Sequence, residues 1–468
     1  MIIRLICTPL FAVFFVLLHA QDAYRYKQLG QWNDTQLPML NSPEGQRWNE
    51  LTGWVDTTSG KEYVIMGSID SVYFFDVSDP AQIKKCDVRS GLNRVVNRDV
   101  EVYGHYAYCV SDNGPSGKMQ VYDLSYLPDS VSLVFESDTF GHNVHSMFVN
   151  PESKRLYLCS VKKSPINIPM MVLSIDTPEK PSLLGLLGII PSGCERVHEV
   201  YIRRDTAFCS CEYKGLFVYD LRNMQNQILL GAITPPYPYN GYNHTSWPDS
   251  ALQHIAFTDE LPNGQPLKVY RIRGFDDMTY LTHFNTNNGA TPHNLFWVGN
   301  LLHVSWYHDG IYTWDMSNPR KPKVHAYFDT YHQNATGDYS GFKGCWGVYP
   351  FFPSGNIAAS DMTNGLFMIR YDQSVGLNNQ ENDFENPVAY PNPSNDLLML
   401  DLNVIESGNY SIQCFDLQGK RMFIQLGNIA DGSNGIIIEK FLELDSGIYA
   451  LTIETDMGYK HTIKILKQ

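Results

Sequence analysis

Four histidines stand at similar intervals in the middle of the chain, each at the start of a short segment that we expect to be a β-strand. They are His145, His198, His244 and His293, separated by 53, 46 and 49 residues. Neutral imidazole is the commonest metal-binding side chain, and it titrates near neutral pH. If the intervals reflect a structural repeat, the four rings occupy equivalent positions and form an arc around one site.

Carboxylates recur at a second position, near the end of the strand that we expect to follow in each repeat. They are Asp70, Asp112, Glu212, Asp259, Glu260, Asp309 and Asp361. Glu199 adds a carboxylate directly after His198. Imidazoles mixed with carboxylates are typical of zinc or another transition metal, whereas carboxylates alone suit calcium. The cofactor that this pattern admits is a divalent metal, zinc or calcium.

Two other interpretations of these residues stay open. A histidine at a repeat position can serve packing by hydrogen-bonding the backbone of the next unit, and an acidic residue before glycine, as in Asp309-Gly310, is an ordinary turn former. In a metal-dependent hydrolase or lyase, the histidines would hold the ion and Glu199 or Glu212 would be the base. The sequence has no serine-centred elbow, paired-cysteine metal motif or phosphate loop.

Aromatic residues concentrate in a proline-rich stretch from Pro235 to Tyr242 and just beyond it. The candidates for an exposed contact surface are Tyr237, Tyr239, Tyr242 and Trp247. A rigid surface of this kind would suit stacking against a polysaccharide, a peptide or another surface protein.

The histidines belong to a degenerate unit of about fifty residues that recurs seven times between Trp48 and Asp372. Its first strands are expected at Asn49–Leu51, Arg98–Val100, His145–Met147, His198–Val200, His244–Ser246, His293–Leu295 and Trp346–Val348. Alternating apolar residues between turn residues predict a second and a third strand, and the third often ends in aspartate before a turn. With a fourth strand in most units, the repeat is typical of a β-propeller blade.

The seventh unit ends after its third strand, Leu366–Arg370, and runs into a polar stretch. The segment Tyr26–Trp32 resembles the fourth strands of the other units. An unpaired edge would leave a row of backbone donors and acceptors exposed, so this segment is expected to supply the missing strand. We therefore predict an all-β chain in which residues 22–373 form a seven-bladed propeller closed by an N-terminal strand.

The net charge restricts the possible partners of the protein, and the N-terminal residues indicate its cellular compartment. A formal net charge of −14 on 468 residues argues against nucleic acid and anionic membrane as partners. Residues 1–20 combine Arg4, an apolar run and Ala20, which is typical of a cleaved signal peptide. No other apolar stretch has the length of a transmembrane segment.

The cysteines support two expectations in an exported protein. Cys109, Cys159 and Cys209 fall at matching places in second strands, which favours small buried residues. Cys194 and Cys211 lie where antiparallel pairing would bring them together, so a disulfide between them is an alternative to two free thiols.

A second domain follows the polar, asparagine-rich residues 374–387, which we interpret as a linker. Its strands are expected at Leu398–Leu402, Tyr410–Asp416, Ile436–Phe441, Ile448–Glu454 and His461–Leu466. Roughly 80 residues of this kind are typical of a small β-sandwich.

Four motifs in residues 388–468 carry a specific resemblance. They are Tyr390-Pro391-Asn392-Pro393-Ser394, Leu417-Gln418-Gly419-Lys420, Gly447-Ile448-Tyr449 and Lys464-Ile465-Leu466-Lys467. The segment resembles the type A C-terminal sorting domain of the type IX secretion system. The resemblance implies recognition by that secretion machinery, and a protein that is released or displayed on the outer-membrane surface of a Gram-negative bacterium.

The repeats also carry a family resemblance. It rests on Trp48-Asn49-Glu50-Leu51, Thr57 to Tyr63, Arg98-Asp99-Val100, Pro292-His293-Asn294-Leu295 and Asp76-Val77-Ser78-Asp79-Pro80. The segment is similar to the choice-of-anchor B family with its LVIVD-type repeats, whose members are surface proteins with one of several anchoring tails. The resemblance implies no particular activity.

These observations together predict an exported propeller that acts as a binding or interaction module. The alternative is a metal-dependent hydrolase or lyase with its site at the mouth of the propeller channel. Binding is favoured over catalysis because a fold by itself licenses no chemistry.

Overall fold

The computed structural model describes residues 23–40, 45–112, 114, 116–188, 193–287, 289–334, 337–372, 388–394, 397–404, 407–416, 420–430, 432–455 and 460–467. The chain forms two compact units, Met1–Tyr371 and Asp372–Gln468. The predicted signal peptide (1–20) and linker (374–387) lie outside the described residues. No helix in the described part of the chain is long and apolar enough to cross a bilayer.

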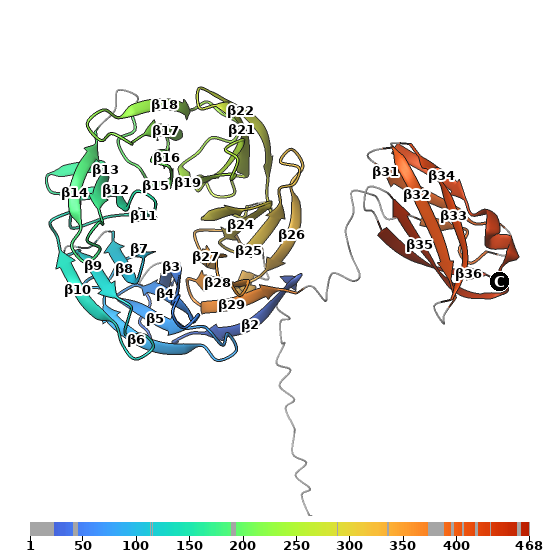
Figure 1. The fold of residues 1–468 in the computed structure, drawn as a ribbon, viewed down its shortest axis with the longest axis horizontal. Helices are drawn as coiled ribbons and strands as arrows, with labels where there is room; N and C mark the ends of the chain where they lie inside the picture. The colour runs from blue at the N-terminus through green and yellow to red at the C-terminus, as the bar shows by residue number, and fades with distance from the viewer. Residues whose placement is uncertain are drawn as a thin grey trace, which may run out of the picture. The chain divides into compact units, whose positions relative to one another are not determined.

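The first unit consists of antiparallel sheets that surround a common centre, as Figure 1 shows. Its described residues form seven sheets, in which successive strands run from the centre outward. The innermost strands are β3 (Trp48–Val55), β7 (Arg98–Tyr103), β11 (Ser146–Asn150), β15 (Glu199–Arg203), β19 (Asn243–Pro248), β23 (Leu295–Val298) and β27 (Cys345–Tyr349). The second strands are β4 (Glu62–Ser68), β8 (Tyr106–Ser111), β12 (Arg155–Lys163), β16 (Thr206–Ser210), β20 (His254–Asp259), β24 (Leu301–Trp306) and β28 (Asn356–Asp361). This arrangement is that of a β-propeller.

The outer half of each sheet follows the same order. The third strands are β5 (Ser71–Asp76), β9 (Met119–Asp123), β13 (Ile166–Ser174), β17 (Leu216–Asp220), β21 (Leu267–Gly274), β25 (Gly310–Asp315) and β29 (Gly365–Tyr371). The fourth strands are β6 (Lys84–Ser90), β10 (Ser132–Ser137), β14 (Ser182–Leu187), β18 (Ile228–Ile233), β22 (Asp277–Phe284), β26 (Lys323–Phe328) and, next to β29, β2 (Tyr26–Trp32). The two-residue strand β1 (Ala23–Tyr24) pairs with β26, and the short 3-10 helix η1 (His332–Asn334) lies between β26 and β27.

The aspartates at the ends of third strands shape the turns that follow. Asp76, Asp123, Asp220 and Asp315 each accept a hydrogen bond from the backbone N–H two residues later, at 2.8 to 3.0 Å. This Asx turn reverses the chain toward the fourth strand. In all seven sheets the pairing of the third and fourth strands then shifts register, which increases the twist of the outer edge.

The cores of the first unit lie between neighbouring sheets. One cluster of buried residues joins the sheet of β3 to the sheet of β27, and it contains Trp48, Phe75, Leu366 and Met368. The N-terminal strand contributes Trp32, whose ring centroid lies 5.7 Å from that of Trp48 and 4.8 Å from that of Phe75. Strand β2 pairs antiparallel with β29, from Tyr26 opposite Tyr371 to Trp32 opposite Leu366. The first and last sheets are thus in contact, and the N-terminal segment pairs with the last sheet.

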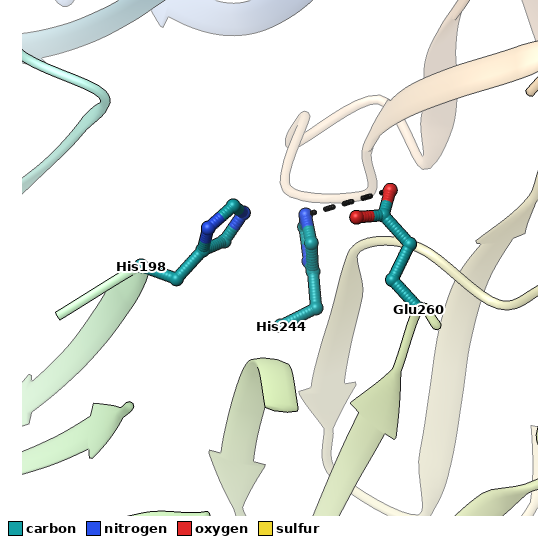
Figure 2. A group of neighbouring side chains, drawn as sticks. All are labelled: His198, His244 and Glu260. Carbon is teal, nitrogen blue, oxygen red and sulfur yellow. Dashed lines mark ion pairs between the residues drawn. The ribbon is translucent and has the colours of Figure 1, made fainter. Parts of the chain in front are cut away.

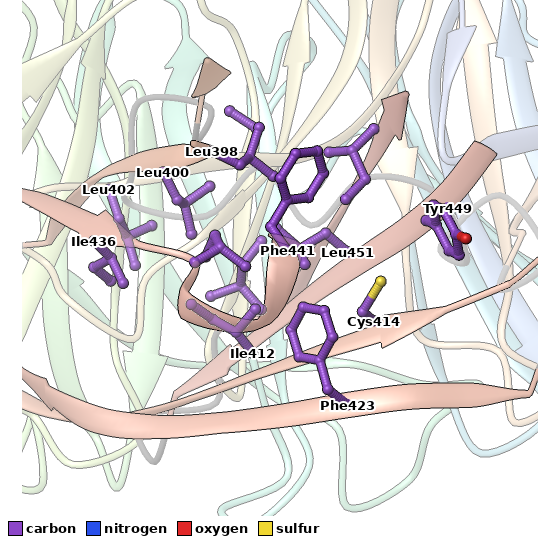
Figure 3. Packing of buried hydrophobic residues seen from close by; sticks show 14 of the residues in the cluster. Leu398, Leu400, Leu402, Ile412, Cys414, Phe423, Ile436, Phe441, Tyr449 and Leu451 are labelled. Carbon is purple, nitrogen blue, oxygen red and sulfur yellow. The ribbon is translucent and has the colours of Figure 1, made fainter. Parts of the chain in front are cut away.

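The second unit has two sheets that share one core, part of which Figure 3 shows. One sheet has the order β30 (Val388–Tyr390), β31 (Met399–Val404) and β34 (Gly432–Ile437). The other has the order β33 (Arg421–Ile429), β32 (Gly408–Phe415), β35 (Gly447–Thr455) and β36 (Lys460–Lys467). Leu400 from one sheet and Ile412 and Leu451 from the other are fully buried in this core.

Three details of the second unit differ from the prediction. The strand expected at Ile436–Phe441 ends at Ile437, and the 3-10 helix η3 (Glu439–Glu443) follows it. Phe441 of this helix is fully buried in the core. Strands β30 and β33 were not predicted, since β30 is short and the apolar residues of β33 are interrupted by polar ones.

Candidate metal centre

A cavity of about 320 Å³ lies among the inner ends of the sheets. The four histidines line it, together with Asp112, Glu199 and Glu260. Each histidine stands at or just before the start of an inner strand, which is why residues about fifty positions apart meet here. Their ring centroids follow one another at 4.0 Å (His145 to His198), 4.3 Å (His198 to His244) and 4.4 Å (His244 to His293).

Hydrogen bonds fix the tautomers of the first two rings. His145 Nδ1 lies 3.0 Å from Asp112 Oδ2, so it donates its proton to that carboxylate. His198 Nδ1 lies 3.0 Å from the hydroxyl of Tyr242, which donates its own proton to Glu212 Oε1 at 2.9 Å. The tyrosine oxygen therefore accepts from His198.

The remaining nitrogens of these two rings face each other. The two Nε2 atoms lie 2.9 Å apart. With its Nδ1 proton donated to Tyr242, neutral His198 carries a lone pair on Nε2, which faces Nε2 of His145. Burial, reinforced by the neighbouring histidines, holds the pKa of His198 well below its usual range, so this lone pair is available to a proton on His145 Nε2 or to a metal ion beside the pair.

The other two rings present nitrogens to the same cavity. His293 Nδ1 donates to the backbone carbonyl of Trp346 at 2.6 Å, which leaves Nε2 with its lone pair. Burial lowers the pKa of His293 to about 3. His244 Nδ1 is buried and has no hydrogen-bond partner among the described residues, and burial likewise holds the pKa of His244 well below its usual range.

Glu260 completes the cluster from the residue after β20. Figure 2 shows its carboxylate turned toward His244, whose Nε2 lies 4.0 Å from Glu260 Oε1. The ligand atoms of His198, His244 and Glu260 all lie within 4.8 Å of one another. Burial raises the pKa of Glu260 to about 7, and the hydroxyl of Tyr307 donates to Oε1 at 2.7 Å.

This arrangement can hold a transition metal ion. A histidine ligand usually donates its second ring proton to a carboxylate or a backbone carbonyl, as His145 and His293 do. Two nitrogens 2.9 Å apart can both reach an ion to their side at the usual distance of about 2.0–2.2 Å. A nitrogen-rich site with one carboxylate suits zinc or a similar ion, whereas calcium prefers an all-oxygen site.

Besides Glu260, two of the predicted carboxylates contact or flank the histidines, and a third reaches them through another side chain. Asp112 holds His145, and Glu199 Oε1 lies 4.0 Å from His244 Nδ1. Glu212 instead binds Arg196 Nε at 3.0 Å and the hydroxyl of Tyr242. It therefore acts on the cluster only through Tyr242.

The remaining predicted carboxylates lie outside the lining of this cavity. Asp259 forms a fully buried ion pair with Lys268 at 2.7 Å. Asp309 accepts hydrogen bonds from Thr286, Asn287 and Tyr339. Asp70 and Asp361 cap turns through Ser71 and Thr363. These four serve local structure, as aspartates near strand ends commonly do.

The predicted aromatic surface is not assembled as expected. Tyr237 is buried and donates to Asp259, whereas Tyr239 is 51% exposed. Tyr242 belongs to the hydrogen-bond chain of His198, and Trp247 lies on the inner strand β19. Hydrogen bonds hold Tyr237 at Asp259 and Tyr242 at His198, so the four rings do not form one exposed surface.

Several residues of the cavity were not singled out from the sequence. Glu50, Asp99 and Tyr307 all line it. Burial raises the pKa of Glu50 to about 8 and that of Asp99 to about 6. Glu50 and Asp99 follow the residues that correspond to the histidines in the first two units, so alignment of the repeats contained the signal.

A disulfide ties together the segments on either side of this hydrogen-bond chain. Cys194 and Cys211 are bonded, with Cα atoms 5.6 Å apart. Arg196 and Glu212 each lie close in sequence to one of these cysteines. Cys109, Cys159 and Cys209 are free and buried, as expected.

The sorting motifs occupy defined places in the second unit. Asn392, between Pro391 and Pro393, donates to the carbonyl of Lys464 at 2.8 Å and accepts from the N–H of Leu466 at 2.9 Å. Gly447 and Tyr449 begin β35, and the Tyr449 hydroxyl donates to the carbonyl of Asp445. Lys420 lies directly before β33, where its N–H donates to Asp416 Oδ1 at 2.9 Å, and Gly419 lies outside the described residues.

Comparison with protein families identifies this second unit. Residues 388–468 match the family described as "Secretion system C-terminal sorting domain". The domain directs export by the type IX secretion system, so the protein is secreted or displayed at the cell surface. The search of curated proteins found no match.

Solved structures give matches to the first unit at low identity. The Myceliophteria thermophila Cps50 (Swd1) β-propeller domain is 11% identical, with a TM-score of 0.46, covering 71% of this chain and 98% of that one. Chaetomium thermophilum Sqt1 is 11% identical, with a TM-score of 0.49 and coverage of 72% and 98%. A functionally unknown protein from Desulfotomaculum acetoxidans is 14% identical, with a TM-score of 0.45 and coverage of 61% and 86%. At these values the matches carry no statement about function.

Proposed function

We propose that this protein is an exported binding module whose propeller channel holds a divalent transition metal ion, with zinc as the first candidate. The observation that carries the proposal is the pair His145 and His198. Their Nε2 atoms face each other at 2.9 Å while both Nδ1 protons are committed to other groups. The lone pair of His198 and the facing nitrogen of His145 form a donor pair for a metal ion in a buried site, and the other two rings with Glu260 extend the same donor set.

The interpretation of the histidines as packing residues accounts for less of this geometry. Of the four rings, His293 is the one whose ring hydrogen-bonds a backbone carbonyl, that of Trp346 in the next sheet. Hydroxyl groups also make contacts between neighbouring sheets beside these rings. Ser146 donates to the carbonyl of His198 at 2.6 Å and Thr258 to that of His293 at 2.9 Å. The sheets could be held together in this way without histidine at all.

The propeller itself is proposed to be a closed ring of seven blades, residues 22–373, of the choice-of-anchor B type. Closure is supported by the pairing of β2 with β29 and by the core shared between the first and last sheets. The family assignment is supported by the repeat motifs of the sequence and by the presence of a sorting tail. Residues 1–20 are proposed to be the signal peptide that precedes type IX export.

A metal-dependent hydrolase or lyase is the second candidate function. It is favoured by the position of Glu199, whose carboxylate lies 4.0 Å from His244 and lines two adjoining cavities. A base in that position could take a proton from a metal-bound water while a substrate occupies the neighbouring space. Glu212 is unsuited to this role because Arg196 and Tyr242 already occupy its carboxylate.

The test is a zinc titration of the purified full-length protein by isothermal calorimetry, after metal removal with a chelator. The wild type is expected to bind one equivalent, and His198→Ala combined with His244→Ala to bind none. The matched control replaces two exposed histidines, His105→Ala with His283→Ala, and retains binding. If the wild type binds no stoichiometric metal and the first pair of substitutions unfolds the protein, the histidines serve packing.

Catalysis is tested separately with zinc-loaded protein and 4-nitrophenyl esters and phosphoesters. Turnover that Glu199→Gln abolishes while the bound zinc is retained would favour the hydrolase. Absence of turnover alongside stoichiometric zinc would favour the binding module.

A further inference from the structure

A second cavity, of about 620 Å³, adjoins the metal centre along the inner strands. The two cavities share Glu50, Asp99, Ser146 and Glu199 in their linings. We call the second cavity the aromatic chamber. Its volume lies within the range of small-molecule sites, which is about 300–1,000 Å³.

Seven aromatic residues line this chamber: Trp54, Phe148, Tyr201, Trp247, Phe296, Tyr349 and Phe351. Trp247 is central, with its ring centroid 4.3 Å from that of Tyr201 and 5.0 Å from that of Phe296. Four of the rings, Phe148, Tyr201, Trp247 and Phe296, stand on the successive inner strands β11, β15, β19 and β23, each two residues beyond a polar side chain nearer the histidines. Side chains two residues apart on a strand share a face, so the channel has a polar layer and then an aromatic one.

The ionisable groups of the chamber are all acidic. Four carboxylates line it, those of Glu50, Asp99, Glu101 and Glu199, and no lysine, arginine or histidine is among the described residues of its lining. Asp99 accepts backbone hydrogen bonds from Val100 and Met147. Burial, together with the charge of Asp99, raises the pKa of Glu101 well above its usual value, as expected for carboxylates without a compensating cation.

Two buried polar atoms of the lining have no hydrogen-bond partner within the described part of the chain. They are the hydroxyl of Ser246, a residue 3% exposed, and Oδ1 of Asn294, a residue 7% exposed. Buried polar atoms are rarely left unpaired, so each one calls for a partner that the folded chain does not supply.

We propose that the aromatic chamber binds an organic cation, a small ligand that carries an amine or quaternary ammonium group on an apolar body. Aromatic faces attract such cations, and the attraction is strongest where water is excluded. Burial raises the pKa of all four acidic groups in the empty chamber, and a bound cation favours their ionised forms, which then supply the opposite charge. A neutral sugar could stack on the same rings, but it would gain no charge attraction from these groups. This inference deepens the binding-module proposal by naming a ligand class, and it needs no metal in the neighbouring cavity.

The probe is choline, compared with its neutral isostere 3,3-dimethylbutan-1-ol, in a calorimetric titration of the full-length protein. Choline is expected to bind about tenfold or more tightly than the alcohol. Trp247→Leu removes the central ring, and Glu101→Gln removes one charge at unchanged size. Each is expected to weaken choline binding by about tenfold or more. Tyr126→Leu is the matched control, with unchanged affinity, because that ring is exposed and lies outside the lining of the chamber.

Thermal unfolding of each variant separates loss of binding from loss of fold, and Glu101→Gln is expected to melt no lower than the wild type because glutamine matches the size of the buried, protonated glutamic acid. Equal affinity for choline and the alcohol would overturn the proposal, as would saturable binding of cellohexaose with none of choline. Titrations with and without zinc keep the two sites apart. Choline binding by a protein that takes up no zinc would support the aromatic chamber and contradict the metal centre. Zinc binding by a protein that takes up no choline would support the metal centre and contradict the aromatic chamber.

Discussion

Replacing Tyr242 by phenylalanine perturbs the proposed metal centre at one oxygen atom. That oxygen lies 3.0 Å from His198 Nδ1 and 2.9 Å from Glu212 Oε1, and it transmits the negative charge of Glu212 to the imidazole. The ring itself remains, so its edge contact with Tyr213, at 5.1 Å between centroids, is preserved. Burial and the charge of Glu212 raise the pKa of Tyr242, so the hydroxyl keeps its proton across the neutral range.

The magnitude follows from what the hydroxyl does. Loss of a group that orients a metal-binding histidine typically costs about 10–100-fold in metal affinity, or about 1.4–2.7 kcal/mol. Stability should also fall, by about 1–3 kcal/mol, because His198 Nδ1 is left buried with an unpaired proton. Glu212 keeps its ion pair with Arg196 at 3.0 Å, so the substitution leaves His198 Nδ1 without its partner but does not leave Glu212 unpaired.

The assay is a zinc titration of Tyr242→Phe beside wild type, with urea unfolding of both metal-free proteins. Tyr213→Phe is the matched control, since that neighbouring residue is 59% exposed and lies outside the cavity lining. Its zinc affinity should equal that of the wild type. Zinc affinity unchanged by Tyr242→Phe, together with lower stability, would show that the hydroxyl serves packing and would refute the reasoning.

Four further outcomes are expected. Zinc affinity should rise by up to about tenfold per pH unit toward pH 7 and then level off, because Glu260, whose pKa is raised to about 7, must lose a proton to bind the ion. Calorimetry across pH 5.5–8.5 checks this expectation, and a zinc affinity that falls as the pH rises would contradict it. Cys194→Ala should lower the free energy of unfolding by about 3 kcal/mol under oxidising conditions, because it opens the loop that the disulfide closes. An unchanged denaturation midpoint would show that the disulfide does not stabilise the fold. Deletion of residues 21–34 should cause aggregation or a much lower melting temperature by uncovering a sheet edge, and a stable monomer would refute ring closure. Deletion of residues 386–468 should leave the propeller folded but hold it in the periplasm, which cell fractionation tests; truncated protein at the surface would contradict it.

Much of the fold was predictable because the same strand and turn pattern occurs in each repeat of the sequence. A weak strand pattern becomes convincing when it recurs seven times, and Asp76, Asp123, Asp220 and Asp315 mark the same turn in four units. The second unit has no repeat to average over. There the structure departs from the prediction at Phe441, where a single helical turn replaces the end of a strand.

The candidate site was predictable in its histidines and less so in their partners. The repeat register indicated that His145 and its three counterparts would meet, but it gave no reason to prefer Asp112 over Asp259. Asp259 is bound by the cation of Lys268, which lies 24 positions after His244 and belongs to no repeated motif that the sequence shows. The aromatic layer was missed although alternation along β15 and β19 placed Tyr201 and Trp247 on the channel face.

The central claim is that the four histidines surround one metal ion, and anomalous X-ray diffraction at the zinc edge tests it most directly. The crystals would be grown from full-length protein loaded with one equivalent of zinc. We predict one strong anomalous peak inside the cavity, about 2 Å from Nε2 of His198 and from ligand atoms of His244 and Glu260. A map with no peak in the cavity, or with its only peaks at surface carboxylates, would contradict the account.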